Sequence, residues 1–337
     1  MRRKLLVLIA VCLTSVVLPL DFSGAAAATP AIGRDLGGTP GQLAWVVNAF
    51  MLSFGSCVMA AGALADQLGR KKLFSLGAAG FVATSIAVAA APTIIWLDLL
   101  RLAQGLTAAA TLAAGSAALA QEFDGAARTR AFSVLGTTFG LGLALGPSLG
   151  GLMLGVIGWR GVFLSGGAVG LVALIVAVPR MRESRDPAAR GLDVPGTLTF
   201  TAALGLFTYG LITAPEHALS TSLAIYFTAL VALVGFIVVE LRASRPMLDL
   251  SLLRYPRFIG VQALPLATAC CYVVLLVLLP LRFIGLEHRS ESESGALMLV
   301  LSAPMVVIPF VTASLARRVS PGLLSAAGLL VAAGGLV

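Results

Sequence analysis

The sequence predicts an all-α protein, a polytopic bundle of transmembrane helices. Of its 337 residues, 58% are hydrophobic and only 11% are charged, whereas a soluble domain carries roughly 25% charged residues. Apolar stretches recur along the whole chain, and basic residues gather in short clusters between them. Surface that faces lipid has to be apolar, so a bilayer accounts for this composition and water does not.

A membrane span needs about 20 apolar residues. Eleven stretches qualify, and in chain order they cover residues 5–28, 42–65, 73–91, 93–120, 130–156, 160–179, 195–214, 219–240, 258–281, 295–316 and 321–337. Asp193 and Pro195 suit the cap and first turn of the seventh helix. Segment 245–257 mixes apolar and basic residues, which is typical of chain lying on a membrane surface. Because the last stretch is apolar to its end, we expect the chain to be truncated.

The distribution of lysine and arginine predicts the orientation. With the N-terminus in the cytoplasm, 18 bases fall in inside segments, four fall outside and Arg101 lies within a span. Cytoplasmic loops carry an excess of these residues, so we expect inside loops at 66–72 and 180–194 and outside loops at 29–41 and 282–294. Arginine outnumbers lysine 20 to 3, which is typical of GC-rich bacteria and favours a bacterial plasma membrane.

The N-terminus has a second interpretation as a secretory signal peptide. Residues 1–4 form a basic region, 5–20 an apolar run and 25–27 a candidate cleavage site. The apolar run continues past Asp21 to Ala28, which is long enough to cross a membrane and favours a first span.

Other protein classes lack support in the composition. The net charge is +8, but there is no basic face or stacking platform for nucleic acid. The two histidines fall in outside loops, and there is no Walker A sequence. The four cysteines lie in apolar runs without metal-ligand or disulfide spacing: Cys12, Cys57, Cys270 and Cys271. We therefore expect no enzymatic activity, no cofactor, no metal and no nucleic-acid partner.

The inside loop after the second stretch carries the most specific motif. It reads Gly62-Ala-Leu-Ala-Asp66-Gln-Leu-Gly69-Arg70-Lys71-Lys72. A tight turn favours glycine at Gly69, the bases hold the loop inside, and a carboxylate such as Asp66 can cap a neighbouring helix N-terminus. An ordinary basic turn would explain the charges but not the spacing.

This motif resembles the loop signature of the major facilitator superfamily, G-x-L-a-D-r-x-G-r-k-x. A faint copy at 313–320 lies at the matching loop of a second bundle, without the aspartate and the glycine, as in transporters built from duplicated halves.

Three further stretches resemble the drug–proton antiporters of this superfamily. Leu20 to Pro30 is similar to the first-helix pattern L-D-x-T-x-x-N-x-A-L-P through Asp21 and Pro30, although Ser23 and Ala26 depart from it. The segment from Leu97 to Gly105 resembles the fourth-helix pattern l-x-x-x-R-x-x-q-G. The fifth-helix pattern g-x-x-x-G-P-x-x-G-G is matched at every fixed position, by Gly142, Gly146, Pro147, Gly150 and Gly151.

Each of these stretches also has a structural interpretation. Glycines spaced by four residues let helices pack closely, Arg101 could pair with Asp98 one turn away, and hydroxyl neighbours such as Ser23 could satisfy Asp21. An ionisable group in a membrane is costly, which favours function. Asp21 and Arg101 each lie about eight residues from the outer end of their helices, on the order of 12 Å below the surface, so they can share one polar layer.

The resemblance implies a proton-coupled exporter of lipophilic or amphipathic molecules. Asp21 and Arg101 would couple protons, the loop at Gly62, Asp66, Gly69, Arg70 and Lys71 would serve the cytoplasmic gate, and Trp45, Asn48 and Gln104 would line a pocket. It also implies a six-helix bundle (1–179), a linker (180–194), an inserted helix pair (195–240), a second linker (241–257) and an incomplete second bundle (258–337). Without the rest of that bundle, the chain alone is not expected to transport. A proton-coupled nutrient importer and a membrane-embedded lipid enzyme are the alternatives.

Overall fold

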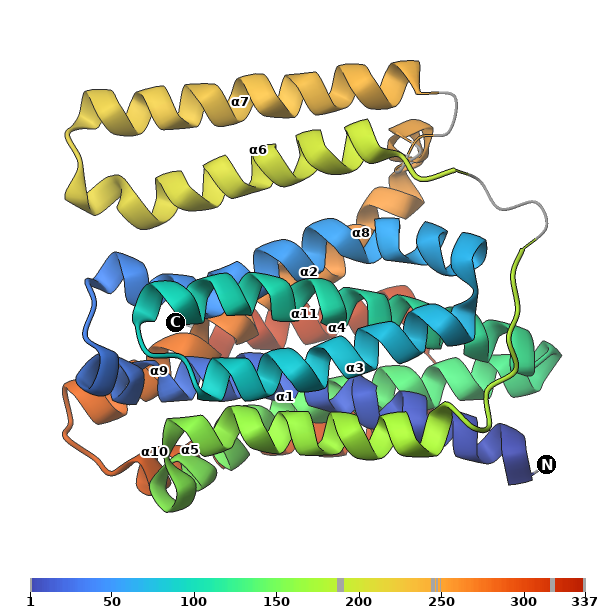
Figure 1. Ribbon diagram of the computed structural model, residues 1–337, viewed down its shortest axis with the longest axis horizontal. Helices are drawn as coiled ribbons and strands as arrows, with labels where there is room; N and C mark the ends of the chain where they lie inside the picture. The colour runs from blue at the N-terminus through green and yellow to red at the C-terminus, as the bar shows by residue number, and fades with distance from the viewer. Residues whose placement is uncertain are drawn as a thin grey trace.

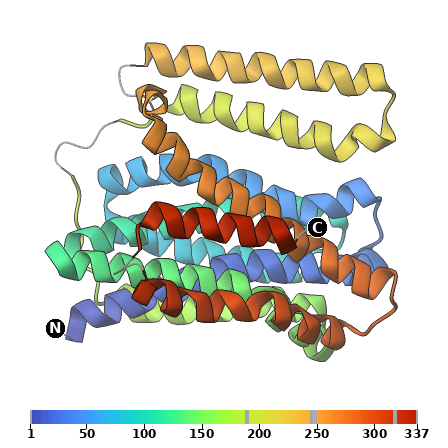
Figure 2. The same cartoon turned by 180° about the vertical axis from the view of Figure 1, so that it is seen from behind.

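The computed structural model describes residues 2–186, 191–243, 246, 248, 250–315 and 319–335. Within these residues every regular element is a helix, which confirms the predicted all-α class. Most of the helices are long and run side by side, some up and some down, as Figures 1 and 2 show from opposite sides. This arrangement satisfies the backbone hydrogen bonds inside each helix, as a bilayer interior requires.

Within the described residues, helix covers most of each predicted apolar stretch. The bounds are α1 Arg2–Leu36, α2 Pro40–Leu68, α3 Arg70–Ala89, α4 Ile94–Glu122, α5 Gly125–Ala177, α6 Val194–Thr213, α7 Leu219–Arg242, α8 Pro256–Thr268, α9 Val274–Gly285, α10 Glu291–Leu315 and α11 Pro321–Gly335. Among the described residues, seven helices are long and apolar enough to cross a membrane: α1 to α4, Ser148–Ala177 of α5, α6 and α7. The predicted number of about 11 spans is therefore approximate.

Two spans depart from straight helices. Helix α5 contains the predicted stretch 130–156 and most of 160–179, joined at Gly158, whose φ of 70° breaks the helix. The predicted stretch 258–281 is interrupted by a π-helical turn at 269–273, between α8 and α9. Of segment 245–257, residues 250–254 form a 3₁₀ turn, whereas 245, 247 and 249 lie outside the described residues.

Helix α1 runs through the middle of the apolar core. Its N-terminal half packs with Phe74 of α3 and Leu119 of α4. Its centre packs with Phe50 of α2, and its C-terminal half with Phe163 of α5. Because α1 touches every one of these neighbours, a polar side chain on it can meet partners from several helices at once.

Helices α1 and α5 approach each other through the predicted glycine face. A Cβ atom at Gly142 would lie 2.7 Å from Cγ of Pro19, one at Gly146 would collide with Ser23, and one at Gly150 would lie 2.8 Å from Cα of Gly24. On the other side of α5, a Cβ atom at Gly295 of α10 would lie 2.8 Å from the Ser148 carbonyl oxygen. Helix α5 is therefore held closely between α1 and α10.

A cluster that the motifs did not indicate fixes the bend of α5 at Gly158. Oδ2 of Asp35, near the end of α1, accepts hydrogen bonds from Nε1 of Trp159 at 2.9 Å and from Nη1 of Arg160 at 2.5 Å. The guanidinium of Arg160 also stacks over the Trp159 ring. These contacts tie the residues after the Gly158 turn to α1.

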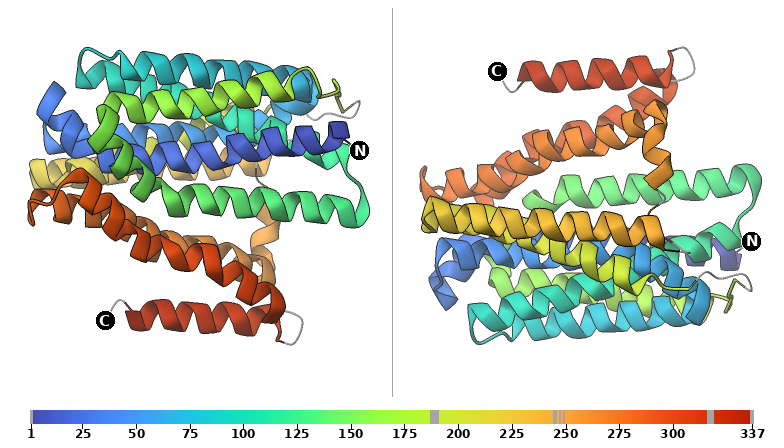
Figure 3. Two further views of the ribbon diagram at one scale, coloured as in Figure 1. Left: turned by 90° about the horizontal axis from the view of Figure 1, so that it is seen from below. Right: turned by 90° about the horizontal axis from the view of Figure 1, so that it is seen from above.

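Helices α6 and α7 form a pair that runs beside α2, at the edge of the structure (Figure 1). The Asp193 side chain accepts a hydrogen bond from the Gly196 backbone N–H at 2.8 Å, so the predicted cap is confirmed. Helix α11 stands apart from the other helices (Figure 3), and most of its described side chains are exposed.

The glycine face yields a prediction about stability. Replacing Gly146 with alanine places a methyl group against Ser23, and overpacking of this kind costs about 1–3 kcal/mol. Gly140→Ala is the matched control, because no atom lies within 4 Å of a Cβ there. We expect the midpoint of thermal unfolding in detergent to fall for Gly146→Ala only. Equal midpoints for the two variants would contradict the close approach of α1 and α5.

Candidate functional site

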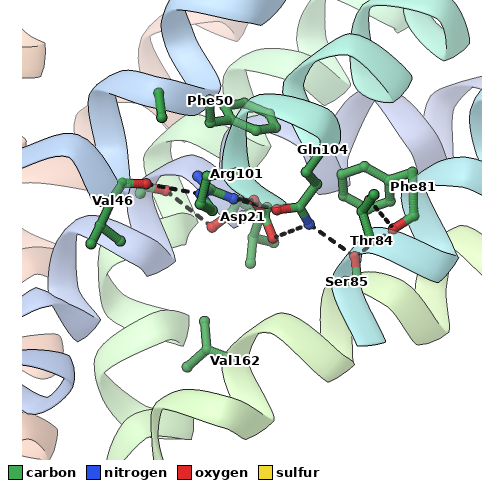
Figure 4. Close-up of polar contacts among 12 residues, drawn as sticks. Asp21, Val46, Phe50, Phe81, Thr84, Ser85, Arg101, Gln104 and Val162 are labelled. Atoms are coloured by element: carbon green, nitrogen blue, oxygen red, sulfur yellow. Dashed lines mark hydrogen bonds and ion pairs between the residues drawn. The ribbon is translucent and has the colours of Figure 1, made fainter. Parts of the chain in front are cut away.

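A buried ion pair lies at the centre of the first helices. Oδ2 of Asp21 on α1 is 2.5 Å from Nη1 of Arg101 on α4, and both side chains have 0% exposure. Figure 4 shows the two groups facing each other between the helices. The depth argument from sequence placed both residues in one layer, and the structure brings them into direct contact.

Gln104, one turn along α4, completes a small polar network. Its Oε1 accepts from Nη1 of Arg101 at 2.6 Å, and its Nε2 donates to Oδ1 of Asp21 at 3.4 Å and to Oγ of Ser85 at 2.9 Å. Ser85 in turn donates to the Phe81 carbonyl oxygen of α3 at 2.7 Å. The network therefore joins α1, α3 and α4 (Figure 4).

The Arg101 guanidinium is held by α2 as well. Its Nε donates to the Val46 carbonyl oxygen at 2.8 Å. Its plane lies over two aromatic rings, with its central carbon 4.4 Å from the Phe50 centroid and 5.3 Å from the Phe163 centroid. Nη2 is buried without a hydrogen-bond partner.

The alternative pairing of Arg101 with Asp98 is not formed. Oδ1 of Asp98 is buried and has no hydrogen-bond partner, and the ion pair of Arg101 is made with Asp21. Asp98 and Arg101 are three residues apart on α4, a spacing that favours a side-chain contact on a helix surface. Helix α1, however, brings Asp21 directly opposite the guanidinium.

At the predicted inside loop, Asp66 and Arg70 form an ion pair across one turn. Oδ1 of Asp66 is 2.8 Å from Nη2 and 3.0 Å from Nε of Arg70. Nη1 of Arg70 also donates to Oε1 of Gln121, at the end of α4, at 3.1 Å. The loop thereby connects the α2–α3 turn to α4.

The carboxylate at the N-terminus of α3 is Glu183, not Asp66. Glu183 accepts from the backbone N–H groups of Lys71 at 3.2 Å and Lys72 at 3.1 Å, where an anion is favoured. Gly69, between the helices, has a φ of 116°, and a Cβ there would lie 2.7 Å from the Glu183 carboxyl carbon. The motif did not reveal Glu183, because it lies over one hundred residues further along the chain.

The remaining predicted residues are distributed as follows. Asn48 lines a cavity between α1, α2 and α9, whereas Trp45 and Gln104 do not line it. A Cβ atom at Gly62 would meet nothing within 4 Å. The Gly151 carbonyl carbon lies 3.2 Å from a Cβ built on Gly295. Pro147 lies in α5, but its side chain, like residues 316–318 of the faint loop copy, is outside the described part of the structure.

A family model described as Major Facilitator Superfamily matches residues 11–337, nearly the whole chain. The chain belongs to the major facilitator superfamily. This confirms the resemblance seen in the loop and helix motifs. It also places the protein with membrane transporters and not with enzymes.

Curated superfamily relatives match along almost the full chain. The multidrug resistance protein Stp of Mycobacterium tuberculosis (strain CDC 1551 / Oshkosh) is 31% identical over 335 residues, covering 97% of this chain and 62% of the relative. The tetracenomycin C resistance and export protein of Streptomyces glaucescens is 29% identical over 343 residues, covering 98% and 62%. The chain thus spans about three fifths of the length of these superfamily relatives.

Solved structures support the same superfamily fold. A peptide transporter POT in complex with sulfate aligns with a TM-score of 0.55 at 16% identity, covering 93% of this chain and 69% of the other. The human organic anion transporter MFSD10 (TETRAN) aligns with a TM-score of 0.56 at 16% identity, covering 95% and 74%. At such low identity these likenesses show the fold alone.

The buried pair yields a second prediction about stability. Arg101→Met leaves the Asp21 carboxylate without its guanidinium, and breaking a buried ion pair costs about 3–5 kcal/mol. The double variant Asp21→Leu/Arg101→Met removes both charges, and replacement of a whole pair by apolar residues is often nearly neutral. We expect the double variant to unfold at a higher temperature than Arg101→Met. A double variant no more stable than Arg101→Met would show that the two charges are not coupled.

Proposed function

We propose that the protein exports a lipophilic or amphipathic small molecule in exchange for protons, by alternating access. The main support is that relatives named for multidrug resistance and for antibiotic export match nearly the whole chain. Because the chain spans about three fifths of those relatives, the proposal concerns the full product of its reading frame. A bacterial plasma membrane fits the bacterial sources of these relatives.

Coupling to protons is proposed for Asp21 and Arg101. The guanidinium stays charged under essentially all conditions, whereas low dielectric favours the neutral carboxyl group and a nearby cation favours the carboxylate. If α1 and α4 separate during the cycle, Asp21 takes up a proton, and when they close it releases the proton. Gln104 and the Val46 carbonyl hold the guanidinium in place while the carboxylate changes state.

The loop from Gly62 to Lys71 is proposed as the cytoplasmic gate. This loop contacts Gln121 and Glu183. Through these contacts the first six spans (residues 1–179) and the start of the linker would move as one body. Helix α5 lies between α1 and α10, so its glycines and Pro147 would form the surface on which the bundles rock. The proposed division of the chain into domains also includes the inserted helix pair (195–240) and the second bundle (258–337).

The coupling proposal predicts a change in gradient dependence. Asp21→Asn removes the titrating group, so drug efflux from proteoliposomes by the full reading-frame product should lose its dependence on an imposed pH gradient. Asp21→Glu should keep part of that dependence. Arg101→Lys should impair transport, because an ammonium group cannot bind Asp21, Gln104 and Val46 together as the planar guanidinium does.

If transport by Asp21→Asn keeps its full dependence on the pH gradient, a residue other than Asp21 carries the proton. The direction of transport is decided by the wild-type protein in the same vesicles. Efflux driven by a proton gradient supports the exporter, whereas gradient-driven uptake of a nutrient would support the importer.

The orientation is also proposed and can be measured. Ser184 lies in the loop predicted inside, and Leu286 in the loop between α9 and α10 predicted outside. In a background without native cysteines, Leu286→Cys should react with an impermeant thiol reagent on intact cells, and Ser184→Cys should react only after lysis. If only Ser184→Cys is labelled on intact cells, the topology is the inverse of the proposed one.

A further inference from the structure

A cavity of about 730 Å³ lies between α1, α2 and the chain from the π-helical turn to the end of α9. This size falls in the range of sites for drug-sized ligands. Its wall is mostly apolar and includes Phe22, Leu43, Val47 and Met51. The polar atoms on this wall therefore determine which ligands can bind there.

Thr29 on α1 presents an acceptor to the cavity. Its single hydroxyl hydrogen is donated to the Ala25 carbonyl oxygen at 3.0 Å, one turn back along the helix. Such back-bonding uses the only donor of the hydroxyl and leaves oxygen lone pairs free. A ligand at Thr29 must therefore supply the hydrogen itself.

Among the described lining residues, Asn48 on α2 is the other with a polar side chain. Its Nδ2 donates to the Ala44 carbonyl oxygen at 3.0 Å. One amide hydrogen is thereby used, while both lone pairs of Oδ1 stay available. Like Thr29, Asn48 offers an oxygen that accepts hydrogen bonds, and it also keeps one amide hydrogen.

The backbone of α1 supplies a third acceptor. Pro30 lies inside α1 and lines the cavity, as does Ala26 one turn before it. Proline has no N–H, so the Ala26 carbonyl lacks the donor that an α-helix normally gives it. The Ala26 carbonyl oxygen therefore lacks its usual helical donor, in a lining residue of the same cavity as Thr29 and Asn48.

Charge is absent from the described lining of this cavity. Asp21 precedes the wall residue Phe22, but its side chain is fully buried and paired with Arg101. A cationic ligand would find no carboxylate, and an unpaired charge inside a membrane is costly. The wall accordingly favours a neutral ligand.

We infer that this cavity binds a neutral aromatic molecule carrying a hydroxyl donor, with Thr29 and Asn48 as the residues that determine specificity. The inference rests on the proposed function, because it names the substrate class of an exporter. The phenol or alcohol O–H donates its one hydrogen to an oxygen of Thr29 or Asn48, while the ring system packs on the apolar wall.

Binding of two pyrene probes and one phenanthridine probe tests the inference. The full reading-frame product in detergent is titrated with 1-hydroxypyrene, with 1-methoxypyrene, which has no donor, and with the permanent cation ethidium, and probe fluorescence is recorded. One hydrogen bond is typically worth a factor of about five to ten in affinity. We expect 1-hydroxypyrene to bind at least about fivefold more tightly than its methyl ether, and ethidium not to displace it.

Two near-isosteric variants locate the acceptors. The single variant that removes the acceptor in use, Thr29→Val or Asn48→Leu, and the double variant should weaken 1-hydroxypyrene about five- to tenfold. Thr29→Val should leave 1-methoxypyrene unchanged, which also shows that the cavity keeps its shape. The matched control is Thr228→Val, because Thr228 makes the same backbone bond, to Ala224 at 2.8 Å, on the exposed surface of α7.

The outcomes separate this inference from the proposed function. Equal binding of phenol and ether, displacement by ethidium, or no binding of any probe would overturn the inference, even if efflux is observed in vesicles. Discrimination that depends on Thr29 and Asn48 supports it, even if efflux is absent and the proposed exporter is wrong.

Discussion

The interaction on which the rest of the structure depends is the ion pair of Asp21 and Arg101 in a membrane interior. Two charges without exposed surface are tolerable only if each is paired and hydrogen-bonded, because neither can reach water. This requirement brings α1 against α4, recruits Gln104 and the Val46 carbonyl, and places Phe50 and Phe163 over the guanidinium. The pair therefore determines how the first helices pack.

Close packing around α1 follows from the same requirement. The glycines of α5 let that helix approach α1 until backbones nearly touch, which removes space that water or lipid would otherwise fill. Further contacts hold the helices together at both ends of the bundle. Glu183 binds the start of α3 on one side, and Asp35 binds Trp159 and Arg160 on the other. Under the proposed alternating access, a body held this firmly at its centre and at both ends would move as a unit.

Much of the architecture was accessible from sequence for simple physical reasons. Apolar runs with short connections predict helices in a bilayer, because no other element satisfies its backbone there without a closed barrel. The cap at Asp193 was visible because capping is local. The break in α5 between two apolar stretches was visible as well, whereas the π-helical turn at 269–273 was not. That turn carries Tyr272, whose hydroxyl donates to the Leu143 carbonyl oxygen of α5, a contact between distant segments.

The sequence by itself determined the residue types and their depths: a carboxylate and a guanidinium in one layer, glycines on one face, and a motif that names the superfamily. Only the tertiary structure decided which partners they meet. It chose Asp21 over the nearer Asp98 for Arg101, and it placed Glu183, not Asp66, at the start of α3. It also brought Thr29, Asn48 and Ala26 together in the lining of one cavity. The physical reason is that the depth and helical face of a residue follow from periodicity along one segment. A contact depends on how several helices pack, and the pattern of a single segment does not contain that information.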